Sequence, residues 1–334
     1  MTRIGLIGAG GMGQNHIKNW LAMPDVQLVA LADIDPKRAA GDLSASWNNL
    51  GITGPAKIEK IKGFTDYRQL LALPEVDIVD VTTPTPLHAQ TVIDALKAGK
   101  HVTCEKPLAR TIPEAQRIVD AAASAKGFFM PAMCMRFWPG WMWLKEAVDD
   151  RRYGKVNSAT FRRLGAMPGG WFRDGKQSGG ALLDLHIHDV DFINYVFGRP
   201  KAVASRGYRL GTGEIDHVVT QYHYDHIPIV AAEGGWPFGD GGGFYMQYQV
   251  HFEHASADFD LARKDNLMLL HQGKFQPVEV PPGDAYFNEL AYFLDCVRKG
   301  QRPTQASASD ALIGLEIVEA EGRSILNGGK VEPV

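Results

Sequence analysis

Three glycines near the amino terminus have the spacing of a phosphate-binding turn. They occur in the segment Gly8-Ala9-Gly10-Gly11-Met12-Gly13, which matches G-x-G-x-x-G. The first glycine permits a tight turn, the second lets the backbone approach a pyrophosphate, and the third permits close helix–strand packing. Asp33 follows twenty residues after Gly13, where a carboxylate can accept hydrogen bonds from ribose hydroxyls. Glycine-rich turns are common without any ligand, but this one follows an apolar run and opens a helical pattern, which favours dinucleotide binding.

The acidic residue also bears on the choice of cofactor. A carboxylate at Asp33 repels a 2′-phosphate, so we expect NAD, with NADP as the other possibility. Lys37 and Arg38 follow within one helical turn. They either soften this preference or are solvated charges on a helix.

Two further groups of residues are suited to proton chemistry. Asp184 and His188 are four residues apart in an expected helix over 180–197, so they would share one face. Imidazole has an ordinary pKa near 6.5, which suits a general base; alternatively the two side chains satisfy each other in a core. The segment Glu105-Lys106-Pro107 ends an expected strand, where open α/β sheets bind ligands. Taken in isolation, the three residues are better explained as a surface turn.

The elements that must position these residues change character along the chain. Up to about residue 130, apolar runs alternate with helical patterns, which predicts βαβ units and a parallel sheet. We expect strands at 4–7, 26–32, 76–82 and 101–104, and helices at 12–23, 36–50, 86–98 and 112–126. Residues 51–63 show no periodicity and are expected to form a loop.

The later part of the chain predicts a different architecture. Short strands rich in Val, Tyr, Phe and His fill residues 201–280 and favour a mainly antiparallel sheet. Helices are expected at 180–197, 284–298 and 307–326. We therefore predict two domains, 1–130 and 131–334.

Composition excludes several classes of protein. The chain has 334 residues, with 35 Lys+Arg against 38 Asp+Glu, so it lacks the basic excess of a nucleic-acid binder. No apolar run approaches the roughly 20 residues that span a bilayer. Three cysteines cannot form a disulfide framework, and the amino terminus is a poor signal peptide. These features lead us to expect a cytoplasmic protein without membrane or nucleic-acid partners.

Five segments together resemble the Gfo/Idh/MocA family, named for glucose–fructose oxidoreductase, inositol dehydrogenase and a rhizopine-catabolism protein. They are GLIGAGGMGQNH at 5–16, VALADIDPKRA at 29–39, DIVDVTTPTPLHA at 77–89, GKHVTCEKPLA at 99–109 and GGALLDLHIHDVD at 179–191. The resemblance implies an N-terminal Rossmann-type parallel-sheet domain that binds NAD(P). It also implies a C-terminal α+β domain with a large, open, mostly antiparallel sheet for substrate binding and oligomerisation. Substrates would be sugar-like or cyclitol-like, and the assembly a homodimer or homotetramer packed through the open sheet face.

The resemblance also assigns roles to residues. Lys106 is the catalytic lysine, Glu105 contacts the cofactor, and Thr83, Pro84 and His88 belong to the segment that lines the nicotinamide ribose. Local alternatives remain, since the prolines can simply end a strand and His88 can simply begin a helix. His188 would be the general base, Lys106 the alkoxide stabiliser and proton-relay partner, and Asp184 the residue that orients substrate.

Weaker signals concern the substrate pocket. The candidates to contact substrate are Arg136, Arg163, Trp171, Arg173, His186 and Tyr286. Trp141 and Trp143 are expected to pack between the domains. His186 departs from the family, which usually has a small residue there, and is expected to narrow the pocket. Because positions two apart on a helix project to nearly opposite sides, His186 and His188 should not share a metal ion, and no metal site is expected.

The sequence leads us to an NAD-dependent dehydrogenase that acts on a secondary hydroxyl. One alternative is a glycosidase or lyase that oxidises its substrate transiently, eliminates, and regenerates NAD with no net redox change. Another is a non-catalytic sensor on the same fold, which the intact Lys106, Asp184 and His188 set disfavours.

Overall fold

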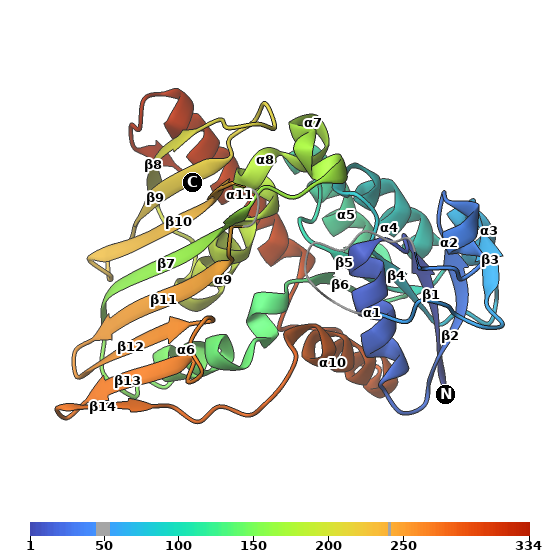
Figure 1. Ribbon diagram of the computed structural model, residues 1–334, viewed down its shortest axis with the longest axis horizontal. Helices are drawn as coiled ribbons and strands as arrows, with labels where there is room; N and C mark the ends of the chain where they lie inside the picture. Colours follow the sequence, from blue (N-terminus) through green and yellow to red (C-terminus); the bar gives the residue numbers. More distant parts are fainter. Residues whose placement is uncertain (45–53, 240–241) are drawn as a thin grey trace. The chain divides into compact units, whose positions relative to one another are not determined.

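The chain divides into two compact units, each described here by itself. The computed structural model describes residues 1–44, 54–239 and 242–334. The first unit comprises Met1–Cys134 and Asp284–Leu312, and the second comprises Met135–Gly283 and Ile313–Val334 (Figure 1). The predicted boundary near 130 therefore falls close to the first crossing, but the later return of the chain to the first unit was not anticipated.

The first unit is a parallel sheet with helices on both faces. Its strands are β1 (Thr2–Ile7), β2 (Val26–Ala32), β3 (Lys62–Phe64), β4 (Ile78–Val81), β5 (His101–Glu105) and β6 (Phe129–Ala132). They lie in the order β3-β2-β1-β4-β5-β6, and each neighbouring pair is parallel. The chain runs outward from β1 in one direction and then from β4 in the other. The carboxyl ends of β1 and β4 therefore form a topological switch point, where such sheets bind ligands.

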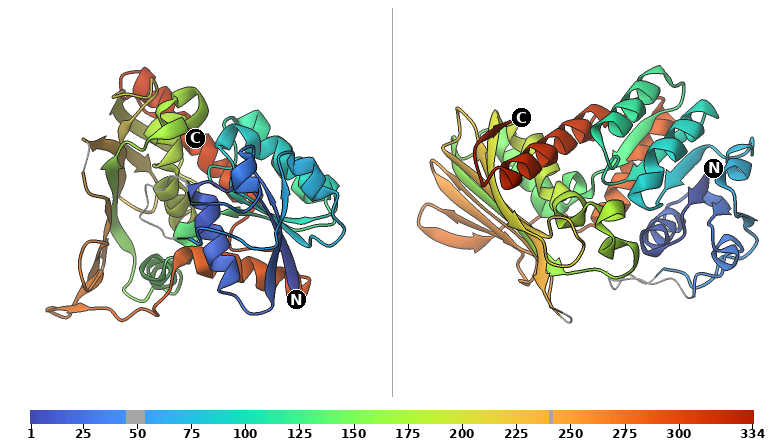
Figure 2. Two further views of the ribbon diagram at one scale, coloured as in Figure 1. Left: turned by 45° about the vertical axis from the view of Figure 1, so that its right-hand side comes forward. Right: turned by 90° about the horizontal axis from the view of Figure 1, so that it is seen from above.

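Helices complete this unit. They are α1 (Gly11–Leu21), α2 (Pro36–Ala39), α3 (Tyr67–Leu71), η1 (Thr85–Leu87), α4 (His88–Lys97), α5 (Ile112–Ser124) and α10 (Ala285–Lys299). Because the two halves wind in opposite directions, α1 lies on one face with α10 beside it, and α4 and α5 lie on the other (Figures 1 and 2). Strand residues such as Ile4, Leu6, Val79 and Val102 have no exposed surface.

One predicted helix is much shorter than expected. The Asp35 side chain accepts the Lys37 N–H at 2.9 Å, so the expected N-cap is present. However, α2 ends at Ala39, and Gly41 takes a positive φ of 89°, the left-handed conformation that terminates helices. The expectation of a helix to Leu50 is therefore wrong as far as residue 44, and its remainder lies outside the described residues.

The second unit is built on a nine-stranded sheet. Its strands are β7 (Val156–Ala166), β8 (Ala202–Tyr208), β9 (His217–His223), β10 (Ile229–Phe238), β11 (Tyr245–Phe252), β12 (Ala255–Asp260), β13 (Leu267–His271), β14 (Lys274–Pro277) and β15 (Glu332–Pro333). Their order is β14-β13-β12-β11-β7-β10-β9-β8-β15. All pairs are antiparallel except β7 with β10. The predicted mainly antiparallel sheet is thus confirmed.

Helices cover one face of this sheet. They are α6 (Pro139–Asp149), α7 (Gly175–Ser178), α8 (Gly180–Asp184) and α9 (Ile187–Phe197), with the short turns η2 (Cys134–Phe137) and η3 (Gly170–Arg173). The division between the units falls inside α11 (Ala308–Leu326). α8 and α9 pack on β7, β9 and β10. Trp141 is fully buried with its ring 4.7 Å from that of Phe192 and 5.3 Å from that of Tyr248. These partners all belong to the second unit, so Trp141 is a core residue of that unit.

Among the described residues, none of the helices combines the length and apolar character needed to cross a bilayer.

Candidate active site

The glycine-rich turn joins β1 to α1, and two of its glycines are required by packing. Gly8 has a φ of 97°, and a Cβ there would lie 2.9 Å from the backbone of Thr82 and Thr83. A Cβ on Gly13 would lie 2.2 Å from the Gly8 carbonyl oxygen. Any side chain at either position would therefore displace the turn from the sheet.

Gly10 has a different reason to lack a side chain. Among the described residues, a Cβ there would meet only the Arg38 Nη1 atom within 4 Å, at 3.9 Å. The protein itself therefore leaves room in front of Gly10. α1 begins at Gly11, and its N-cap residue, Gly10, makes no side-chain hydrogen bond to the first N–H groups of the helix. A helix N-terminus beside open space is suited to a pyrophosphate, so this turn fits a dinucleotide.

Asp33 follows the carboxyl end of β2, beside the same turn. Its carboxylate accepts the N–H of Ala9 and of Asp35, both at 2.8 Å, and lies 3.3 Å from Arg38 Nη2. These bonds fix the orientation of the Asp33 carboxylate beside the glycine-rich turn. Arg38 is thereby partly neutralised by Asp33, although it lies next to Gly10.

The His88 imidazole lies within hydrogen-bond distance of the backbone of two loops in the first unit. Its Nε2 lies 2.8 Å from the Thr83 carbonyl oxygen and its Nδ1 lies 2.8 Å from the Pro107 carbonyl oxygen. The ring is almost fully buried, and burial lowers the pKa of His88 although both carbonyls oppose this. His88 thus supports the cofactor-side loops through their backbone. The buried Thr83 hydroxyl has no hydrogen-bond partner in the part of the chain that the structure describes, so it is available to a ligand there, next to Pro84.

Glu105 and Lys106 end β5 at the carboxyl edge of the sheet. Glu105 Oε1 lies 3.0 Å from His16 Nε2, and its Oε2 accepts the Lys106 N–H at 3.1 Å. Burial alone would raise the pKa of Glu105, but the hydrogen bond and charge of His16 outweigh it, so the pKa is lowered. Glu105 is therefore a buried anion that holds the start of the Lys106 turn, whose peptide to Pro107 is cis.

In the second unit, the predicted single helix over 180–197 is interrupted. Gly179 and Gly180 have φ of 82° and 68°, and α8 ends at Asp184. The Ala181 carbonyl accepts the N–H of both Leu185 and His186, at 3.0 and 2.8 Å, which widens the turn by one residue. Asp184 thus closes α8 and His188 lies in the first turn of α9. The relation of Asp184 to His188 is not that of a regular helix.

Two aspartates that follow His188 in sequence each form a buried ion pair. Arg163 reaches both oxygens of Asp189, at 2.9 and 3.1 Å, and Arg136 reaches both oxygens of Asp191, at 2.9 and 2.6 Å. All four side chains are at most 3% exposed. Both guanidinium groups therefore bind carboxylates of α9, and contact of Arg136 or Arg163 with substrate stays a prediction.

His186 is likewise a core residue. Its side chain is fully buried, and Nε2 lies 3.3 Å from Glu321 Oε1 and 3.2 Å from the Tyr222 hydroxyl. Burial alone would lower the pKa of His186, but Glu321 raises it. A Cβ on Gly234 would lie 2.3 Å from the imidazole, so β10 packs directly on the ring. The histidine does not narrow a pocket, contrary to expectation.

The remaining substrate candidates are surface or half-buried residues. Trp171 is half-buried and stacks on Phe172 with ring centroids 4.2 Å apart, and exposed Arg173 donates to the Pro168 carbonyl at 3.4 Å. Tyr286 lies in the first turn of α10, in the first unit rather than the second.

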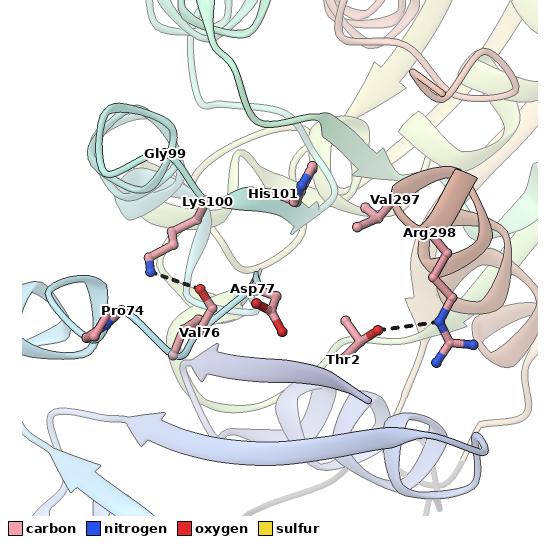
Figure 3. Close-up of a pocket in the computed structure, with 9 residues that line it drawn as sticks. All are labelled: Thr2, Pro74, Val76, Asp77, Gly99, Lys100, His101, Val297 and Arg298. Atoms are coloured by element: carbon pink, nitrogen blue, oxygen red, sulfur yellow. Dashed lines mark hydrogen bonds between the residues drawn. The ribbon is translucent and has the colours of Figure 1, made fainter. Parts of the chain in front are cut away.

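A pocket of about 440 Å³ lies at the opposite edge of the parallel sheet (Figure 3). Thr2, Val76 and His101, at or next to the amino ends of β1, β4 and β5, line it together with Arg298 of α10. Ligands of such sheets bind at the carboxyl ends. This pocket is therefore separate from the glycine-rich turn and from Lys106.

Comparisons with known proteins agree with this geometry. Residues 2–133 match the family model described as an oxidoreductase family with an NAD-binding Rossmann fold, and residues 141–258 match the GFO/IDH/MocA C-terminal domain. Rhizopine catabolism protein MocA of Rhizobium meliloti is 31% identical over 95% of this chain and 93% of its own length. The chain belongs to the Gfo/Idh/MocA family. As in that family's N-terminal domain, its first unit binds NAD, and the chain is an NAD-dependent dehydrogenase.

Other members of the Gfo/Idh/MocA family align over nearly the whole chain. A protein of Bacillus subtilis (strain 168) named scyllo-inositol 2-dehydrogenase (NAD(+)) is 27% identical over 99% of this chain and 96% of its own length. The solved structure of levoglucosan dehydrogenase in complex with NADH and levoglucosan superimposes with a TM-score of 0.87. It is 22% identical and covers 100% of this chain and 99% of that chain, which shows a common fold.

Several residues around the site of this Gfo/Idh/MocA protein were missed from the sequence. They are His16, Asp80 and Glu289 in the first unit and Asp189 and Asp191 in the second. His16 shares a helix face with buried Trp20, and Asp80 lies inside an apolar strand; these two signals could have found them. The partners of the others are remote in sequence.

The environment of Asp33 predicts a change of cofactor preference. Substituting Asp33→Ser removes the carboxylate from the ribose position and releases Arg38, so we expect NAD to bind about 10- to 100-fold more weakly, as loss of charged hydrogen bonds implies. NADP should bind more tightly than before. Fluorescence titration with both cofactors measures the two dissociation constants. In Asp33→Ser/Arg38→Met the NADP gain should vanish; an equal gain there would rule out Arg38 as its source.

Proposed function

We propose that this NAD-dependent dehydrogenase oxidises a secondary hydroxyl of a cyclitol, a sugar or a sugar derivative. The observation that carries the proposal is the open turn at Gly10, which shares the carboxyl edge of the first sheet with Asp33 and Lys106. The substrate class is supported by relatives named for inositol and by the levoglucosan dehydrogenase fold.

In this proposal the chain's own residues manage the proton and the charge of the substrate hydroxyl. Bound nicotinamide supplies the hydride acceptor. His188 accepts the hydroxyl proton at an imidazole nitrogen, since imidazole is the side-chain group best suited to general-base catalysis near neutrality. The Lys106 ammonium stabilises the negative charge that develops on the substrate oxygen. Asp184 orients the substrate hydroxyl. Thr83, Pro84 and Glu105 line the cofactor site, and Trp171, Arg173 and Tyr286 remain candidates for substrate contact.

The experiment that tests the function is a panel of cyclitols, free sugars and anhydrosugars, each assayed with NAD and with NADP. We expect net NADH formation, followed by absorbance, with at least one polyol of the panel. Cleavage of a glycoside without net NADH would contradict the proposal. So would cofactor binding with no turnover of any polyol.

We further propose that the second unit binds substrate and forms a homodimer or homotetramer through its open sheet face, in the cytoplasm. Along β11, residues alternate between buried and outward-facing positions. Val219 of β9, Ile229 of β10 and Tyr245 of β11 are large apolar residues that are at least 40% exposed. Light scattering at micromolar concentration should give a mass of two or four chains. A single-chain mass would contradict this assembly.

A further inference from the structure

A buried group of three titratable side chains lies behind the Lys106 turn. His16 comes from α1, Glu105 from β5 and Glu289 from α10, and one ligand-type atom of each lies within 4.8 Å of the others. All three belong to the first unit and are buried. The proposed function uses none of them except Glu105.

His16 is held by carboxylates on both sides. Its Nδ1 lies 2.9 Å from Asp80 Oδ2 and its Nε2 lies 3.0 Å from Glu105 Oε1. Asp80 is fixed in turn by the Trp20 indole N–H at 2.7 Å. Ionised carboxylates only accept hydrogen bonds, so both ring nitrogens carry a proton and His16 is an imidazolium. Burial alone would lower the pKa of His16, but Asp80 and Glu105 raise it well above its usual value.

Glu289 has no exposed surface, and both of its carboxyl oxygens lack a hydrogen-bond partner in the described structure. The charged groups that face it are Glu105, His16, Asp80 and Asp284. An ionised Glu289 would place a third buried carboxylate beside a single imidazolium. An uncompensated buried charge is costly, and such a group binds a proton instead. Burial, reinforced by Glu105, raises the pKa of Glu289 well above its usual value.

We propose that Glu289 is a positioning residue for Lys106: it stays a neutral acid that donates its proton in a hydrogen bond to the Glu105 carboxylate, which in turn holds the Lys106 N–H. One carboxyl oxygen of Glu289 lies within 4.8 Å of one carboxyl oxygen of Glu105. The hydrogen bond can therefore form through one bridging water or after a small rotation of the Glu289 side chain. The consequence for turnover rests on the proposed function, but the protonation state of Glu289 does not.

The same three residues are the donor types of a divalent-metal site, and the hydrogen bonds of His16 argue against it. A histidine ligand needs a free lone pair on one ring nitrogen. In His16 both nitrogens are directed at carboxylate oxygens at hydrogen-bond distance. A protonated Glu289 therefore explains why these three side chains can be buried together better than a bound cation does.

Two substitutions of Glu289 separate a neutral donor from an anion. Glu289→Gln keeps the shape and an N–H donor, whereas Glu289→Leu keeps neither the donor nor the acceptor. We expect Glu289→Leu to lower kcat about 10- to 100-fold, as slight misplacement of a reacting group does, with little change in the dissociation constant for NAD. Glu289→Gln should restore most of kcat. Equal losses in both variants would overturn the proposal.

Two readouts on the cofactor-free protein do not depend on activity. Infrared difference spectra of wild type against Glu289→Gln should show a protonated-acid carbonyl band in the wild type at neutral pH, shifted in D₂O. The usual pKa of glutamate is 4.5. Above that pH, Glu289 releases its proton in the unfolded chain but keeps it in the folded protein. The Tm of the wild type should therefore fall relative to the Tm of Glu289→Gln as pH rises.

The outcomes distinguish the possible failures. Absence of the acid band together with a Tm difference that does not change with pH would show an ionised Glu289 and overturn the proposal. A rise in Tm of wild type with added Zn²⁺ that Glu289→Gln lacks would establish the metal alternative instead. If the acid band is present but no polyol is turned over, the proposed function fails while the protonated Glu289 stands.

Discussion

Replacing His188 with glutamine is expected to lower kcat about 10²- to 10⁴-fold, the usual contribution of a positioned general base. NAD binding should be unchanged, because His188 belongs to α9 of the second unit and the glycine-rich turn to the first. Lys106→Met should lower kcat about 10²- to 10³-fold by removing the charge that stabilises the alkoxide. Stopped-flow measurement of the first turnover, with a separate NAD titration, checks both expectations.

A histidine away from the site provides the control for these variants. His251 lies in β11, is exposed, and bonds the Ser256 hydroxyl at 2.8 Å. His251→Gln should retain wild-type kcat. If His188→Gln and Lys106→Met both turned over at the wild-type rate, the assignment of these two residues would be refuted.

The second large effect concerns the ion pair that supports α9. Arg163→Met should lower the free energy of unfolding by about 3–5 kcal/mol, because it leaves the buried Asp189 carboxylate without its partner. Arg163 Cζ lies 5.4 Å from the Trp141 ring centroid. Urea unfolding followed by tryptophan fluorescence therefore reports on the region that changes.

The neighbouring residue on the same strand is a matched control. Arg162 pairs with Glu233 at 2.8 Å, but its side chain is 45% exposed. Arg162→Met should cost less than about 1 kcal/mol, as exposed pairs do. Arg163→Met/Asp189→Leu should recover much of the loss, because it removes both charges. Equal destabilisation by Arg162→Met and Arg163→Met would contradict this account of the buried pair.

Local signals predicted the parallel-sheet unit well. Strands buried on both faces appear as continuous apolar runs, and the glycine-rich turn and Asp35 act over a few residues. The same local signals did not predict the helix end that depends on a single residue. Gly41 ends the helix that was expected to reach Leu50.

Contacts between residues far apart in sequence could not be predicted. Arg163 and Asp189 are 26 residues apart and Arg136 and Asp191 are 55 apart, and nothing in a single sequence pairs them. His186 was expected to narrow the pocket because the family usually has a small residue at that position. Its ring instead meets Glu321, 135 residues away. The wide turn at Ala181 was hidden because its residues fit a regular helical pattern.

The return of the chain to the first unit affects how that unit is made. Residues 1–134 leave the ribosome well before residues 284–312, which include α10 and its contact with α1. Until then, the nascent nucleotide-binding sheet lacks one of its covering helices and the carboxyl group that faces His16. Exposed apolar surface of this kind is bound by chaperones or aggregates. Completion of the first unit must therefore wait until residues 284–312 have been synthesised.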